Sequence, residues 1–175
     1  MDSRKPKSCV GCSLAELGCG FLRPDGQGLN GVAIIGEAAG KHEAKDSLPF
    51  RPHAKAGGLL QQMFRMCGFK RSDFTIYNIV NCQPPSNELL GAAYEAAAIA
   101  HCRPNLDVVI EQAKPRILLA LGGTAFKALT GRDLSISENR GYIFNSIYNI
   151  PVVGSYHPAF LLRNAMHLLG VALHD

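Results

Sequence analysis

The cysteines of this chain are spaced in a way that could hold a metal group. Cys9 and Cys12 form a C-x-x-C motif ahead of the first apolar run, and Cys82 and Cys102 lie far downstream, each two residues before a proline. A thioredoxin-like redox pair should follow a strand and open a helix, whereas this pair precedes the first expected strand. Four thiolates suit a [4Fe–4S] cluster, and zinc is the second choice because zinc sites usually contain two close pairs. A simpler interpretation is that Cys82 and Cys102 are only buried.

Two cysteines remain outside this set. Cys67 falls on the apolar side of an expected helix and is predicted to be a core residue, whereas Cys19 could replace one of the four ligands. Residues 1–30 lack a hydrophobic period, so we expect an irregular segment that a cluster fastens to the rest of the chain. In that role the metal group is structural.

The elements that would position reactive side chains alternate between strands and helices. This order predicts a three-layer α/β/α fold with a central, mostly parallel, four-stranded sheet. Ligand sites in such sheets lie at the carboxyl ends of the strands, where the loop 36–56, Asn78, the turn 82–87, Gly122-Gly123 and His157 should gather. Buried strands are expected at 31–36, 74–80, 116–121 and 150–155, with helices at 57–68, 89–113 (interrupted near Pro104), 124–130 and from 158 onward.

The bulk composition narrows the classes of protein. With 175 residues, 47% hydrophobic and 18% charged, the chain is predicted to form one globular domain over residues 1–175. No apolar run reaches the roughly 18–20 residues that span a bilayer. The first seven residues are basic without a following apolar region, so we expect a cytoplasmic, nucleoid-associated protein without disulfides. A net charge of +4 permits contact with a polyanion without requiring it.

Several short motifs, in this order, resemble the iron–sulfur branch of the uracil-DNA glycosylase superfamily, often called family 4. They cover most of the chain between Cys9 and Arg163. The matching blocks are the C-x-x-C motif, Gly36-Glu37-Ala38-Ala39-Gly40, Pro49-Phe50, the Ala56–Leu60 helix start, Asn78 to Pro85, Cys102 to Leu106, Lys114 to Gly122, Arg140-Gly141 and Tyr156 to Arg163.

Three departures from the family pattern surround the expected base pocket. Ala39 replaces the usual proline of G-E-x-P-G, the segment 50–57 is about two residues longer than usual, and the interval from Cys82 to Cys102 is also longer. These changes affect the expected choice of substrate more than the fold.

The resemblance implies an enzyme that extrudes a base from DNA and reads it in a pocket. It places Phe50 as the platform on which the base stacks and Asn78 as the amide that reads the edge of uracil. His157 is expected to donate a hydrogen bond to the base O2, where negative charge develops as the glycosidic bond breaks.

The family pattern also implies two carboxylates. Glu37 aligns with the acid that orients the attacking water, and Glu43 aligns with a second pocket carboxylate; the sequence does not decide which is essential. The backbone of Ala38 is expected to line the pocket, and His53 is either a second donor or a surface residue.

Residues of the DNA-contacting surface follow from the same resemblance. Leu161 or Leu162 could enter the base stack as a wedge, although a helix start also uses leucine in the core. Lys55 and Arg163 are expected to contact phosphates. The ligands of the [4Fe–4S] cluster, or of zinc in the alternative, are Cys9, Cys12, Cys82 and Cys102.

The expected function is a monomeric, monofunctional uracil-DNA glycosylase that leaves an abasic site. No motif places a lysine as a Schiff-base nucleophile, so no lyase step is expected. The alternative is a related protein that binds uracil-containing or abasic DNA with little turnover. A dinucleotide-dependent enzyme is disfavoured because the first strand lacks G-x-G-x-x-G.

Overall fold

The computed structural model describes residues 4–163 and 165–175 and contains a five-stranded sheet in the order β2-β1-β3-β5-β4. All strand pairs are parallel except β4 with β5. The predicted α/β fold with a mostly parallel sheet is confirmed, but the count of four strands is wrong because the short antiparallel edge strand β4 was not expected. The strands are β1 (Val32–Ala38), β2 (Phe74–Val80), β3 (Ile117–Leu121), β4 (Ile143–Asn145) and β5 (Pro151–Ser155).

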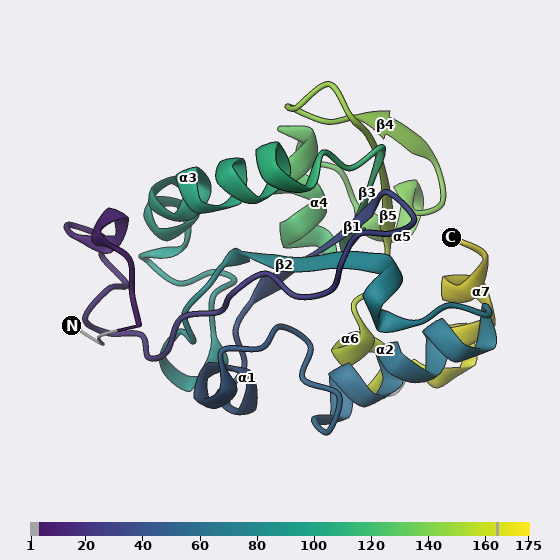
Figure 1. Cartoon of the computed structure of the whole chain (residues 1–175), viewed down its shortest axis with the longest axis horizontal. Helices are drawn as coiled ribbons and strands as arrows, with labels where there is room; N and C mark the ends of the chain where they lie inside the picture. Colours follow the sequence, from purple (N-terminus) through teal and green to yellow (C-terminus); the bar gives the residue numbers. More distant parts are fainter. Residues whose placement is uncertain (1–3, 164) are drawn as a thin grey trace.

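Helices cover both faces of the sheet (Figure 1). On one face α3 and α4 pack onto the largest hydrophobic cluster, and on the other face α2 packs against the strands and then against α6 and α7. This arrangement gives the three predicted layers. The helices are α1 (Lys41–Asp46), α2 (Lys55–Met66), α3 (Glu95–Ala113), α4 (Gly123–Thr130), α5 (Ile136–Asn139), α6 (Pro158–Leu162) and α7 (Leu169–His174), with 3-10 turns η1 (Lys7–Cys9), η2 (Arg71–Asp73), η3 (Pro85–Asn87) and η4 (Met166–Leu168).

Helix α3 differs from its prediction at two points. It begins at Glu95 rather than near 89, since Gly91 adopts a φ of +78° that ends helical geometry. It continues through Pro104, where an interruption was expected. Leu106, Val109 and Ile110 are buried against the sheet beyond the proline, and this packing offsets the missing N–H hydrogen bond.

The described part of the N-terminal segment runs along the outer edge of β2. Cys19 pairs antiparallel with Gln83 and Asp25 with Ile76, and the Leu22 N–H donates to the Asn81 carbonyl at 2.6 Å. The segment thereby supplies hydrogen-bond partners to a strand that has β1 on its other side only. Within residues 4–163 and 165–175, no helix combines the length and apolar content that a bilayer crossing needs.

Candidate active site

A cavity of about 1120 Å³ opens at the carboxyl ends of the parallel strands. Its wall combines residues that follow β1, β3 and β5 with residues of the loop that precedes α2. Segments that are far apart in the sequence therefore meet at the carboxyl ends of the parallel strands, as expected for this kind of sheet. Of the predicted residues, those on the wall are Glu37, Ala38, Glu43, Phe50, Lys55, His157 and Arg163.

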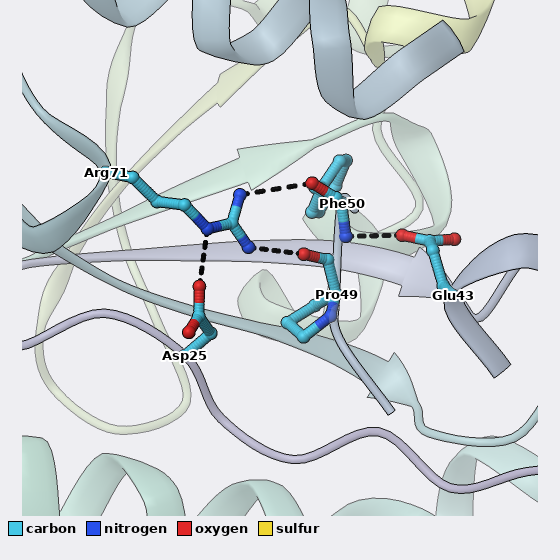
Figure 2. Close-up of polar contacts among 5 residues, drawn as sticks. All are labelled: Asp25, Glu43, Pro49, Phe50 and Arg71. Carbon is cyan, nitrogen blue, oxygen red and sulfur yellow. Dashed lines mark hydrogen bonds and ion pairs between the residues drawn. The ribbon is translucent and has the colours of Figure 1, made fainter. Parts of the chain in front are cut away.

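The loop between α1 and α2 is held by the carboxylate of Glu43 (Figure 2). One oxygen accepts the Gly40 N–H at 2.6 Å, and the other accepts the N–H of Phe50. Burial raises the pKa of Glu43, and the two amide donors act against that shift. Both carboxylate oxygens thus bind the backbone of the cavity wall, an arrangement that fixes the position of Phe50.

The Phe50 ring lies on the cavity wall next to two residues of the sheet, Gly36 in β1 and Asn78 in β2. Gly36 and Asn78 are paired in the register of β1 and β2, and the missing side chain at Gly36 leaves the space in which the ring and the Asn78 amide meet. Asn78 is 1% exposed, and its Oδ1 finds no hydrogen-bond partner in the described part of the chain. Asn78 does not line the cavity itself, so its contact with a bound base stays a prediction.

His157 lies across from Phe50, with 5.4 Å between the ring centroids. As the N-cap of α6, its Nδ1 accepts the Ala159 N–H at 3.1 Å. Burial, followed by the charge of Arg163, lowers the pKa of His157 to about 4. The ring is therefore neutral near pH 7, and because Nδ1 is an acceptor the remaining proton sits on Nε2 as a donor.

Glu37 approaches the cavity from the end of β1. Its Oε2 accepts the hydroxyl of Thr124 at 2.7 Å, at the start of α4. This contact orients the carboxylate and was not predicted. In the sequence, Gly122-Gly123 indicated a loop at this place but gave no sign that the Thr124 hydroxyl would bind Glu37.

The predicted DNA-contacting residues divide into two groups. Lys55 and Arg163 are exposed at the cavity rim, and Leu162 is 40% exposed. Leu161 is completely buried against α2 and α7, so it is not available as a wedge and its assignment is corrected. His53 is exposed and lies off the cavity wall, which leaves it as a surface residue. Phe160, 46% exposed on the cavity rim, is an apolar candidate that the sequence reading missed.

The four cysteines proposed as ligands line one small cavity between the N-terminal segment, helix α3 and the chain that follows β2. Cys9, Cys12, Cys82 and Cys102 all face it, although they come from η1, the turn after η1, the segment that follows β2 and helix α3. Cys19 is exposed, and its Sγ lies 3.0 Å from the side-chain oxygen of Gln83, outside this group. Cys67 is exposed as well, so its predicted core position is wrong.

Polar groups lie around the four sulfurs. Burial, followed by the neighbouring Cys102 and Cys12, raises the pKa of Cys9, and burial raises the pKa of Cys82 to about 12. The buried ammonium of Lys5 acts against both shifts. Side-chain amides of Asn81 and Asn105 lie 3.5 and 3.6 Å from the Cys102 Sγ. Four soft donors with a buried cation and N–H···S contacts fit an anionic thiolate-bound metal group. Within the described residues, no three ligands converge closely enough to hold a single metal ion.

Comparison with known proteins decides the family. The family model described as the uracil DNA glycosylase superfamily matches residues 25–171. The chain belongs to the uracil-DNA glycosylase superfamily. The resemblance read from the motifs is thereby confirmed.

Curated relatives support the same assignment within the superfamily. A Type-4 uracil-DNA glycosylase of Thermotoga maritima is 32% identical over 99% of this chain and 88% of its own length. Type-4 uracil-DNA glycosylases of Pyrobaculum aerophilum and Saccharolobus solfataricus are each 32% identical over 90% of this chain, and over 81% and 74% of their own lengths. The similarity therefore includes both the cavity and the cysteine segment.

Proposed function

We propose that this chain is a DNA repair enzyme that hydrolyses the N-glycosidic bond of uracil in DNA and leaves an abasic site. The observation that carries the proposal is the convergence of Glu37, Phe50 and His157, from three separate elements, on the wall of one cavity. Membership in the superfamily and the names of the relatives support the reaction class.

The geometry supports a role for each of these three side chains. The face of Phe50 receives the extruded base, and stacking of this kind is worth about 1–3 kcal/mol per base. His157 donates its Nε2 proton to the base O2, and one such donor contributes about 2.7–4 kcal/mol as negative charge develops. Glu37, oriented by Thr124, holds the attacking water and stabilises the cationic sugar.

Selection of uracil is assigned to Asn78. Its amide offers an acceptor to the base N3–H and a donor to O4, and cytosine presents the opposite pattern at these atoms. A buried Oδ1 without a partner is costly, which supports a role in which a ligand supplies the missing hydrogen bond.

We further propose that Cys9, Cys12, Cys82 and Cys102 hold a structural [4Fe–4S] cluster. Four thiolates are the donor set that such a cluster takes, and the four cysteines line one cavity beside the buried Lys5. Bound, the cluster fastens the N-terminal segment, and hydrolysis requires no electrons from it.

The partner is DNA, contacted at its phosphates by Lys55 and Arg163 and at the base stack by Leu162. We propose a monomer that acts in the nucleoid. No lysine is assigned to attack the sugar, so the reaction ends at the abasic site.

The test uses end-labelled single- and double-stranded oligonucleotides that contain one uracil. Strand scission that appears only after alkali treatment supports excision without a lyase step, and scission without alkali would contradict the second part. A stable complex that yields no scission would replace the proposal with a binding protein.

A further inference from the structure

The loop that carries Phe50 is held by hydrogen bonds on both sides (Figure 2). Glu43 accepts the Phe50 N–H, and the Arg71 guanidinium donates to the carbonyls of Pro49 at 2.5 Å and of Phe50 at 3.1 Å. Arg71 also forms an ion pair with Asp25 at 2.5 Å. One guanidinium thus binds two successive carbonyls of the cavity loop and one carboxylate of the N-terminal segment.

The backbone of Phe50 requires such support. Its φ of +45° lies in the left-handed region, which is unfavourable for a residue with a side chain. The same peptide lies close to α2, because the absent side chain of Gly57 leaves room for the carbonyls of Phe50 and Arg51. An unrestrained loop would relax to negative φ and turn the ring away from His157.

We propose that Arg71 is a positioning residue for base binding, which holds the Phe50 ring at the angle that stacks on the extruded base. Arg71 touches neither the base nor the reacting atoms, since it does not line the cavity. It acts through the carbonyls of residues 49 and 50, with Asp25 fixing the guanidinium plane. This inference deepens the proposed function and rests on it for the identity of the bound base.

The geometry also explains why an arginine occupies this position. Three acceptors surround the guanidinium, and its planar fork reaches all of them at once from Nε and both terminal nitrogens. A lysine ammonium is a single point donor and cannot span the two carbonyls and the carboxylate together.

The experiment compares Arg71→Ala and Arg71→Lys with the native chain and with Arg65→Ala, which removes the same charge from an exposed position on α2. Single-turnover excision should fall roughly 10–100-fold in Arg71→Ala, as expected for a misplacement of about 1 Å. Inhibition by free uracil should weaken, whereas affinity for uracil-free DNA should stay native. The excision rate of Arg71→Lys should lie between those of the native chain and Arg71→Ala. Millimolar guanidinium ion should restore part of the excision rate of Arg71→Ala.

A readout independent of catalysis separates this inference from the proposed function. Hydrogen–deuterium exchange of the peptide 48–52 should accelerate in both Arg71 variants and stay unchanged in Arg65→Ala. Native exchange in that peptide, or native excision in folded Arg71→Ala, overturns the positioning role. If the native chain fails to excise uracil, the exchange result still decides the role of Arg71. If Arg71→Ala does not fold, Arg71→Lys decides the question by the same two measurements.

Discussion

Replacement of Gly36 with alanine should disable the cavity while leaving the chain folded. A Cβ at this position would lie 2.6 Å from Phe50 Cζ and 2.7 Å from Phe50 Cε2, and it would also overlap the Asn78 Oδ1. Ordinary contact begins at 3.4 Å, so the ring must retreat by about 0.8 Å. Overpacking of this kind costs about 1–3 kcal/mol.

Two measurements check this prediction. For a chain of this length, a loss of about 2 kcal/mol lowers the Tm by roughly 4–8 °C, which a thermal melt resolves. Single-turnover excision of uracil should fall by about 10²-fold, because Phe50 is displaced from the base and Asn78 is pushed with it. Both effects arise from one methyl group on the sheet floor.

The matched control is Gly170→Ala in α7. A Cβ there meets no atom within 4 Å, and alanine should raise helix stability by up to about 1 kcal/mol with native excision. Native excision in Gly36→Ala would show that Phe50 and Asn78 do not form the base pocket, and the proposed stacking and reading roles would both fall.

Three further predictions use other parts of the molecule. His157→Ala should slow excision by roughly 10²–10³-fold with DNA affinity retained, measured by single-turnover kinetics and fluorescence anisotropy. Because the pKa of His157 in the folded chain, about 4, lies below the ordinary 6.5, the stability of the native chain should fall as the pH drops from 6.5 towards 4. Thermal melts of the variant should lack this pH-dependent loss of stability. Cys82→Ala should lose iron and the absorbance near about 400 nm, whereas Cys19→Ala should keep both, and equal iron loss in the two variants would contradict the ligand set. Leu161→Ala should cost about 2–5 kcal/mol in chemical denaturation, whereas Leu162→Ala should be nearly neutral in stability and should reduce excision from double-stranded DNA more than from single strands.

The sequence predicted the layers of the fold because the four strands are apolar runs or segments rich in β-branched and aromatic residues. It missed β4 because Ile143–Asn145 is too short to show a period and follows a loop. It expected an interruption at Pro104, since proline propensity is a local signal and the packing of α3 on the sheet is not. The start of α3 was predicted too early because the alanine content of the segment favours a helix and does not reveal the positive φ of Gly91.

The site was predicted at the positions where the family's motifs match this chain. Glu37, Phe50 and His157 reach one cavity wall as expected, because strand ends of a parallel sheet meet at one edge. Arg71 and Thr124 were missed, since their partners are two backbone carbonyls and two carboxylates that only the folded chain brings near. Leu161 and Leu162 could not be separated by sequence, because the face of a five-residue helix is decided by its neighbours.

The N-terminal segment has a consequence for handling the protein. Along β2 and the residues that follow it, the segment occupies hydrogen-bonding groups that another chain could otherwise pair with, at Ile76, Asn81 and Gln83. Exposed strand margins of this kind template self-association. If the proposed cluster fastens the segment, its oxidative loss would uncover β2, and the first sign of a deteriorating preparation would be turbidity, ahead of any loss of helical signal.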